Sequence, residues 1–283
     1  MNHLLSKIGS YPFEKLNLLH KDIKPSKEVI NLSIGEPKLN ADSKVLDILN
    51  KETNSFSNYP PMNAVPELSE AYRQYLKNHF GIENVAEDEV CLVAGTREGT
   101  FSIIQALFNK KNVKDKPYVV MPNPFYQIYG GATTLAGGEA KFLDCPEEDN
   151  FQPDFDSLKS EDWQKCQILV LCSPNNPTGS VLPLSKLKNI LDLAEKYDFY
   201  VVSDECYVDL YTSEKSCPSI LQASSDRSDR LIALHSLSKR SNLPGFRSGF
   251  ACSGKKTISA YKKFRSFHGL SLIHISEPTR PRL

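Results

Sequence analysis

Short apolar runs alternate with helical patterns through the middle of the chain, and this alternation limits the fold more than any other feature. Parallel strands need a crossover connection between them, so the alternation predicts an α/β fold with a mostly parallel sheet covered by helices. Residues 184–194 show one such crossover, because apolar residues recur there at helical spacing with charged residues between them. The β-branched and aromatic runs are 89–94, 118–121, 168–172, 200–203 and 231–234.

The charge of the chain is balanced, with 34 basic and 34 acidic side chains among 283 residues. Such a chain lacks the overall field that favours nucleic acid or an anionic membrane, so we expect a small molecule or another protein as its partner. No run of about 18 apolar residues occurs, and residues 1–7 lack the apolar stretch of a signal peptide. We therefore expect a cytoplasmic protein.

The cysteines are odd in number and form no CxxC pair. This scatter favours reduced, mostly buried thiols over disulfides, and no ligand spacing supports a metal site. We therefore predict no bound metal. The seven cysteines lie at positions 91, 145, 166, 172, 206, 217 and 252.

Two stretches fall outside the alternating pattern. Residues 16–27 are polar and mixed and include Pro25, which is typical of an arm or linker. Residues 271–283 contain two prolines and do not continue the helical pattern that precedes them. This last stretch resembles the translation of a sequencing-adapter read-through, so we treat it as a non-native tail outside the fold.

Residues 236–247 point most directly to chemistry. Lys239 follows an apolar run, and a poorly hydrated lysine in such a place favours the neutral amine that forms a Schiff base. A lone Ser-x-Ser-Lys would more often contain an ordinary surface lysine. Here Ser236 and Arg247 also offer a hydroxyl and a guanidinium, the groups that hold a phosphate dianion.

A second candidate phosphate element lies at residues 94–99, between an apolar run and a helical pattern. Gly95 and Thr96 would leave backbone N–H groups directed at an anion, and the helix dipole would add to the attraction. Taken alone, Gly-Thr before a helix is as often a helix cap. Its interpretation therefore depends on the other elements.

Asp204 and Tyr207 follow the run 200–203. A carboxylate at the carboxyl end of a parallel strand lies where such sheets bind ligands, and Asp204 would pair there with a protonated pyridine nitrogen. Tyr207 would donate to a phenolic oxygen of the same ring. The alternative for Asp204 is a helix N-cap.

Two further segments also follow apolar runs. In Ser-Pro-Asn-Asn-Pro-Thr-Gly at 173–179, Asn176 offers an amide to the same phenolic oxygen, although two prolines and a glycine would be a plain turn in most proteins. In Pro-Phe-Tyr at 124–126 an aromatic ring would stack on a pyridine ring. For Phe125 we favour core packing.

These segments occur in the order found in the class I/II aminotransferases, the fold-type I enzymes that depend on pyridoxal 5′-phosphate (PLP), and the chain resembles that family. The resemblance implies a PLP-dependent transferase large domain with three layers, a mostly parallel sheet between helices. The matching residues are Gly35-Glu36-Pro37, Tyr59, Gly95-Thr96-Arg97, Tyr126, the Asn-Pro-Thr-Gly of 176–179, Asp204, Tyr207, Ser236, Lys239 and Arg247.

The resemblance also implies roles for these residues. Lys239 would hold PLP and act as general base and acid, with Asp204 and Tyr207 completing the catalytic set. Gly35 and Asn176 would contact the substrate, and Tyr59 would reach the phosphate bound by a partner subunit in a homodimer. The remaining cofactor contacts would come from Gly95, Thr96, Arg97, Tyr126, Asn176, Ser236 and Arg247.

The resemblance further predicts an order of domains. Residues 1–40 would form an N-terminal arm and the start of a small domain, and residues 41–270 an incomplete PLP-binding large domain. The family's small domain carries an arginine that clamps the substrate carboxylate, and nothing here matches it, since Arg280 and Arg282 lie in the suspected tail. We therefore expect this chain, with its small domain largely missing, to be a poor catalyst.

Shorter sequence segments resemble those of one subgroup of the family, the succinyldiaminopimelate aminotransferases of bacterial lysine biosynthesis. They include Tyr-Pro-Phe-Glu-Lys-Leu at 11–16 and the Arg240-Ser241-Asn242 insert. The implied substrates are small amino and oxo acids, with glutamate and 2-oxoglutarate as donor and acceptor. Alternatives are an aminotransferase of another amino acid such as aspartate, a PLP-dependent C–S lyase, and a non-catalytic PLP-binding protein. The regulatory form of the last normally carries a DNA-binding domain, which the short N-terminus here does not contain.

Overall fold

The structure is a computed structural model that describes residues 1–30, 34–57, 66–109, 117–210, 217–224 and 228–268. The expected non-native tail at 271–283 lies outside the described residues. In the described part of the chain, no helix is long and apolar enough to cross a membrane.

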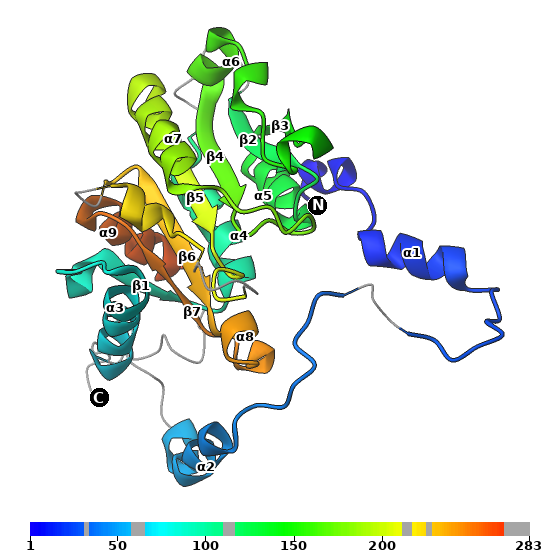
Figure 1. Ribbon diagram of the computed structural model, residues 1–283, viewed down its shortest axis with the longest axis vertical. Coiled ribbons are helices and arrows are strands. Elements are labelled where there is room, and N and C mark those ends of the chain that lie inside the picture. The colour runs from blue at the N-terminus through cyan, green and yellow to red at the C-terminus, as the bar shows by residue number, and fades with distance from the viewer. Residues whose placement is uncertain (31–33, 58–65, 110–116, 211–216, 225–227, 269–283) are drawn as a thin grey trace.

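The described residues form one seven-stranded sheet with the order β1-β7-β6-β5-β4-β2-β3 (Figure 1). All neighbours pair in parallel except β7, which is antiparallel to both β1 and β6. The prediction of a mostly parallel sheet is therefore confirmed. The strands are β1 (Val90–Val93), β2 (Tyr118–Asn123), β3 (Glu139–Asp144), β4 (Cys166–Cys172), β5 (Tyr200–Asp204), β6 (Leu231–Ser236) and β7 (Gly249–Cys252).

Two of these strands, β3 and β7, are absent from the runs identified in the sequence. β3 is an edge strand that buries only Leu143, so it lacks a continuous apolar run. β7 is four residues long and begins at a glycine. Both strands owe their pairing to neighbours rather than to a strong local pattern.

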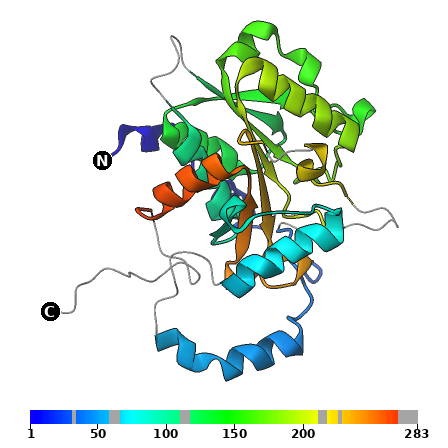
Figure 2. The same ribbon diagram turned by 90° about the vertical axis from the view of Figure 1, so that its left-hand side faces the viewer.

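Helices cover both faces of the sheet, which gives the expected three layers (Figures 1 and 2). Helices α3 (Pro66–Phe80), α6 (Ser160–Lys165) and α7 (Leu184–Tyr197) lie on one face, and α4 (Thr96–Leu107), α5 (Gln127–Ala136) and α9 (Lys255–Arg265) on the other. Helix α8 (Leu237–Arg240) follows β6. The short 3-10 helices of this body are η3 (Glu87–Glu89), η5 (Glu147–Asp149), η6 (Phe155–Ser157), η7 (Ile220–Ala223) and η8 (Pro244–Phe246).

The predicted crossover helix is α7, which connects β4 to β5. It buries Leu187, Ile190 and Ala194, and their spacing of three and four residues places them along one stripe against the sheet. The same arrangement repeats on the other face, where Ile103 and Ile104 of α4 are fully buried. Each layer is therefore held by apolar contacts that the local sequence encodes.

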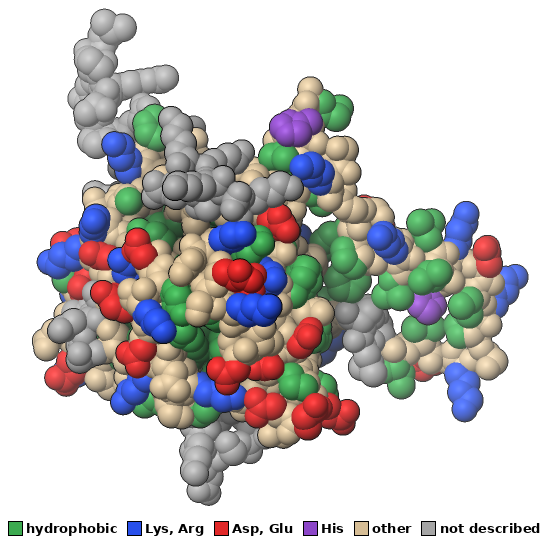
Figure 3. All heavy atoms as spheres, turned by 90° about the horizontal axis from the view of Figure 1, so that it is seen from above, with side chains coloured by type: hydrophobic (Ala, Val, Ile, Leu, Met, Phe, Trp, Pro, Cys, Tyr) green, Lys and Arg blue, Asp and Glu red, His purple; other side chains and the backbone are tan. Residues whose placement is uncertain are grey.

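The N-terminal segment is organised differently. It contains η1 (His3–Lys7), α1 (Pro12–His20), α2 (Ser43–Lys51) and η2 (Thr53–Ser57), and none of its described residues is buried. Helices α1 and α2 project from the body (Figure 1), and hydrophobic side chains are visible at the surface of the projecting segment in Figure 3. Of residues 16–27, which we expected to form an arm or linker, the first five belong to helix α1 (Pro12–His20).

Five of the seven cysteines are buried. The prediction that most of the thiols are buried is therefore confirmed. Among the described residues, no group of three or more His, Cys, Asp or Glu side chains is arranged to hold a metal ion.

Candidate active site

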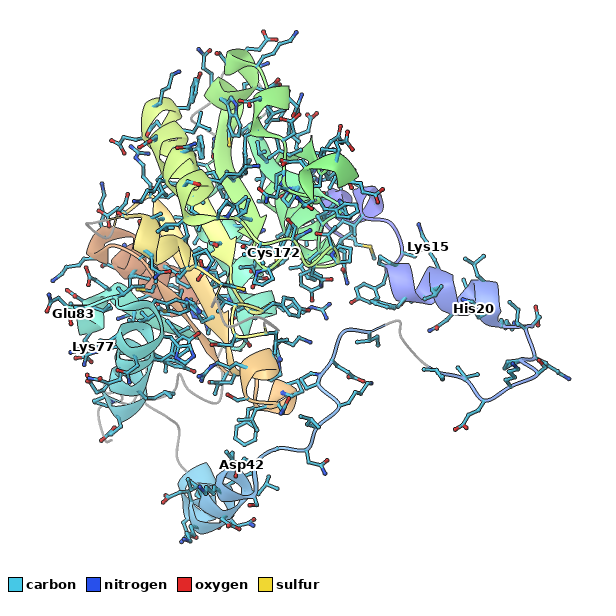
Figure 4. The ribbon with its side chains drawn as sticks, viewed as in Figure 1. Lys15, His20, Asp42, Lys77, Glu83 and Cys172 are labelled. Atoms are coloured by element: carbon cyan, nitrogen blue, oxygen red, sulfur yellow. The ribbon has the colours of Figure 1, made fainter. Side chains whose placement is uncertain are left out.

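The predicted site residues gather at the carboxyl ends of the parallel strands. Asp204 ends β5, Asn176 follows β4 and Lys239 follows β6. Because parallel strands present their carboxyl ends at one edge of the sheet, these side chains are brought to a common place. Cys172, labelled in Figure 4, marks the end of β4 near the centre of the molecule.

Lys239 lies on α8 and is half-buried. Its Nζ donates a hydrogen bond to the backbone oxygen of Gly35, which comes from the N-terminal segment. The same Nζ lies 5.6 Å from the ring centre of Tyr207, and a Cβ added at Gly35 would lie 3.9 Å from the Tyr207 hydroxyl. Lys239, Tyr207 and Gly35 are therefore brought together from three distant parts of the chain.

The two candidate phosphate elements also meet. Gly95 has a φ of +81° and is packed so closely on the Arg247 guanidinium that any Cβ there would collide with it. Arg247 Nη2 donates to the backbone oxygen of Ala94 over 3.1 Å, which fixes the guanidinium beside the start of α4. Thr96 begins that helix and is buried, and the helix has no side-chain cap. An anion would therefore find a helix N-terminus and a guanidinium together.

Ser236 and Arg97, two further predicted cofactor contacts, lie at the end of β6 and in the first turn of α4. Ser236 is buried at the end of β6, and its Oγ accepts from the Ser238 backbone N–H at 3.1 Å. The Arg97 guanidinium is exposed and lies 5.7 Å from the ring centre of Tyr11 in the N-terminal segment. Its side chain therefore contacts the N-terminal segment, while its backbone remains in the first turn of α4.

Asp204 is a buried carboxylate at the centre of the site. Its Oδ2 accepts from the Tyr129 hydroxyl at 3.0 Å, and its Oδ1 accepts from the Cys206 backbone N–H at 3.3 Å. Burial nevertheless raises the pKa of Asp204 above its usual range. Residues 206–209 form a turn and no helix, so the alternative of a helix N-cap is wrong.

The aromatic and amide groups expected around the ligand lie nearby. Tyr126 precedes α5 and is half-buried, and its ring meets that of Tyr129 edge to face with centres 5.7 Å apart. Burial raises the pKa of Tyr207, which therefore keeps its proton at neutral pH. Asn176 is half-buried in the turn after β4. Phe125 packs against Phe142 at 5.1 Å between ring centres, which confirms its interpretation as a packing residue.

The sequence did not predict the side chains that hold these groups in place. Tyr129, the buried donor to Asp204, lies three residues after Tyr126, and this helical spacing was the available signal. Glu98 accepts from the Ala94 N–H at 3.1 Å, and Arg265 of α9 donates to Glu98 at 2.6 Å. Nothing in the local sequence links Arg265 to residue 98, because the contact joins two helices far apart in the chain.

Tyr59, the residue predicted to reach a partner subunit, lies outside the described residues. The predicted substrate contact Gly35 is described, although residues 31–33 before it are not.

The arrangement fits PLP in three ways. Asp204 is a buried carboxylate that forms no ion pair with a Lys, Arg or His side chain in the described part of the chain, so a cationic ring nitrogen would supply the missing charge. The uncapped start of α4 and Arg247 suit a phosphate dianion. Lys239 supplies the amine that an aldehyde requires.

Comparisons with known proteins agree with this chemistry. Residues 27–275 match the family model described as aminotransferase class I and II. The LL-diaminopimelate aminotransferase of Aquifex aeolicus is 29% identical over 265 residues, which cover 93% of this chain and 67% of that protein. The chain thus spans about two thirds of the length of this curated relative.

Solved structures show the same relationship. An aminotransferase from Neisseria meningitidis Z2491 superposes with a TM-score of 0.90 at 39% identity, over 96% of this chain and 70% of that one. The aminotransferase AspB from Helicobacter pylori 26695 superposes with a TM-score of 0.87 at 35% identity, over 94% and 70%. The chain therefore belongs to the class I and II aminotransferases, a family of PLP-dependent enzymes.

Proposed function

We propose that this aminotransferase moves an amino group between glutamate and N-succinyl-2-amino-6-oxopimelate, giving N-succinyl-LL-diaminopimelate and 2-oxoglutarate, with Lys239 as the residue that holds PLP. Family membership supports the reaction class, and the convergence of Lys239, Tyr207 and Gly35 is the observation that carries the site assignment. The substrate assignment is supported by the sequence segments that resemble the succinyldiaminopimelate aminotransferase subgroup.

Bound PLP supplies an electron sink for the negative charge that develops at the substrate Cα. Lys239 Nζ would accept the proton from the substrate Cα and later return one, acting as base and then as acid. Its place on α8, half-buried beside Tyr207, limits the water around the amine. Proton transfer needs that amine within hydrogen-bond reach of the reacting carbon.

Asp204 would hold the ring nitrogen in its protonated form, because a buried carboxylate is stabilised by a cation placed against it. Tyr129 orients that carboxylate by donating to Oδ2. Tyr207 and Asn176 would donate to the phenolic oxygen, and Tyr126 would stack on the ring. Gly95, Thr96, Ser236 and Arg247 would hold the phosphate.

A second candidate substrate is free LL-diaminopimelate, which differs from the first by the absence of the succinyl group. It is favoured by similarity to relatives such as the LL-diaminopimelate aminotransferases of Aquifex aeolicus and Natranaerobius thermophilus. The two candidates differ in charge at the distal end. Both keep the distal α-carboxylate, but free diaminopimelate carries an ammonium group beside it, whereas the succinylated substrate carries a neutral amide and an additional carboxylate.

A homodimer with shared sites belongs to the same proposal. It is supported by the position of Tyr59 in the family pattern and by the apolar side chains on α1 and α2 that the described part of the chain leaves exposed, including Leu18 and Ile48. Sedimentation at several protein concentrations tests it, and a monomer at every concentration would contradict it.

The deciding experiment is a substrate panel on the longest polypeptide that the gene encodes. Glutamate formation from 2-oxoglutarate would be measured with N-succinyl-LL-diaminopimelate, LL-diaminopimelate, aspartate and an aromatic amino acid. We expect the highest kcat/KM with the succinylated compound. Preference for free diaminopimelate would replace the first candidate by the second, and preference for aspartate would contradict both. Release of pyruvate from a sulfur amino acid added to the panel, without an oxo acceptor, would indicate a C–S lyase instead.

A further inference from the structure

Helix α8 carries Lys239 but is too short to hold its own orientation. It has four residues, none of them buried, and an isolated helical turn is unstable in water. Its first turn is anchored at the end of β6, where Ser236 Oγ accepts from Ser238 and Leu237 donates to the Ser248 backbone at 3.1 Å. The orientation of the other end, next to Lys239, must come from another contact.

Arg240 provides that contact. Its Nε donates to Asp209 Oδ2 at 3.0 Å, and its guanidinium carbon lies 4.4 Å from the ring centre of Tyr75 on α3. A planar guanidinium that both stacks on a ring and donates to a carboxylate has few orientations left. The end of α8 is therefore fixed against α3 and against the turn after β5.

Asp209 is itself held in place. Its side chain is only 13% exposed, Oδ2 also accepts from the Tyr75 hydroxyl at 2.8 Å, and Oδ1 lies 3.0 Å from His79 Nε2. Burial and the Asp209 carboxylate raise the pKa of Tyr75, so the phenol keeps its proton and donates. An exposed ion pair usually contributes little because its side chains remain free to move, whereas this carboxylate has three partners.

The turn that carries Asp209 also carries Tyr207. Within it, Val208 donates to the Glu205 backbone at 3.1 Å and Leu210 donates to the Tyr207 backbone at 2.9 Å. The contact between Arg240 and Asp209 therefore joins the segment that bears Lys239 to the segment that bears Tyr207. Neither residue of the pair is placed at the ligand itself.

We propose that Asp209 and Arg240, backed by Tyr75, are positioning residues that set the Lys239 amine relative to Tyr207 and to the cofactor's aldehyde carbon. The inference rests on the proposed role of Lys239. It gives a task to Arg240, which belongs to a sequence insert that the cofactor contacts leave unexplained.

The test separates bond formation from cofactor affinity. PLP is mixed with the full chain, and the rate of bond formation to Lys239 is followed by absorbance and by borohydride trapping with peptide mapping. Affinity is measured separately with pyridoxamine 5′-phosphate, which lacks the aldehyde. We expect Asp209→Asn and Arg240→Gln each to slow bond formation on the order of tenfold to a hundredfold, since misplacement by about 1 Å has effects of that size.

The affinity for pyridoxamine phosphate should change by less than about twofold in both variants, because the phosphate contacts remain. The double variant should be no slower than the slower single variant, because both changes break one contact. Arg240→Lys keeps the charge and should recover part of the rate. As a matched control, Lys186→Gln removes an exposed ion pair with Asp149 and should leave the rate unchanged.

Wild-type rates in Asp209→Asn and Arg240→Gln would overturn the inference. So would a loss of pyridoxamine phosphate affinity equal to the loss of rate, which would indicate a general disturbance of the fold. If the unsubstituted chain is labelled on another lysine, the proposed role of Lys239 fails and the inference fails with it. If Lys239 is labelled but the variants react normally, only the positioning role fails.

Discussion

In the body of the chain, residues 66–268, six of the seven residues of β4 are buried, whereas no described side chain is buried in residues 1–57, which we call the arm. Both regions contain helices with apolar side chains. In α7 these side chains contact a sheet, while Leu18 and Leu19 of α1 are more than two thirds exposed. Apolar side chains therefore stabilise the body by contacts within it. The apolar side chains of the arm make no such buried contact with the described residues.

The two regions meet at a few polar contacts near the candidate site. Gly35 accepts from Lys239, and Tyr11 contacts both Arg97 and Gln127. The arm thus contacts side chains of the candidate site, although it buries little surface area against the body. This difference predicts that changes in the body and in the arm will have effects of different size and kind.

The largest expected effect is on the bond to PLP, and it is expected for a lysine of the body but not for a lysine of the arm. Lys239→Ala should abolish the bond to PLP that borohydride fixes, because the reacting amine is gone. Lys15→Ala should leave the label on Lys239, since Lys15 lies on the projecting α1, well away from the end of β4 (Figure 4). Peptide mapping after reduction measures both. A reducible adduct in Lys239→Ala would show that another lysine reacts.

Stability should divide in the same way. Leu169→Ala in β4 leaves a cavity in a fully buried position and should lower the free energy of unfolding by about 2–5 kcal/mol. Leu18→Ala in α1 removes the same atoms from an exposed position and should change it by less than about 0.5 kcal/mol. Urea unfolding measures both values. Equal losses would mean that the arm is part of the cooperative unit.

A smaller effect comes from a buried pair that only the body contains. Glu205 Oε1 accepts from Ser203 and from the Ile220 N–H, and Oε2 lies 3.3 Å from His235 Nε2. Burial raises the pKa of Glu205 from 4.5 to about 7 and lowers the pKa of His235 to about 3, the latter with help from the charges of Arg240 and His79.

The sign of the pH effect follows from these pKa values. Between pH 4.5 and 7 the folded state keeps a Glu205 proton that the unfolded state has lost, so its contribution to stability disappears as the pH rises through 7. Glu205→Gln removes this loss, because glutamine does not ionise. The variant should gain on the order of 1 kcal/mol relative to the wild type over this pH range. The free energy of unfolding would be measured with urea at each pH for both proteins. If the two plots against pH are parallel, Glu205 is already ionised in the folded state.

Much of the body could be predicted from sequence because its signals are local. The apolar runs, the spacing in α7 and the polar residues just after strands are read within a few positions, and the common edge of a parallel sheet brings Asp204 and Lys239 together. Contacts across the chain had no such signal. The donor Tyr129, the support of Glu98 by Arg265, and the Arg240–Asp209 contact depend on how helices pack.

The arm was harder to interpret for the same physical reason. Residues 16–27 have weak apolar periodicity, and the end of α1 within them makes no buried contact that a pattern would reveal. The resemblance to the family placed Gly35 near the substrate, and its contact with Lys239 emerges only in three dimensions.

The smallest expected effect tests whether the arm opens independently of the body. Gln127 Nε2 donates to the Tyr11 hydroxyl at 2.8 Å, and Tyr11→Phe removes that acceptor while keeping the ring beside Arg97. One such hydrogen bond contributes about 1 kcal/mol, so opening of α1 should become roughly fivefold more frequent. Amide hydrogen exchange in α1 should quicken accordingly, while the free energy of global unfolding changes by less than about 0.5 kcal/mol. Tyr197→Phe is the matched control, because it removes a hydroxyl that contacts Ser160 on the body and should leave exchange in α1 unchanged. Unchanged exchange in Tyr11→Phe would mean that other contacts hold α1. A loss of global stability comparable to that of Leu169→Ala would mean that the arm and the body unfold together.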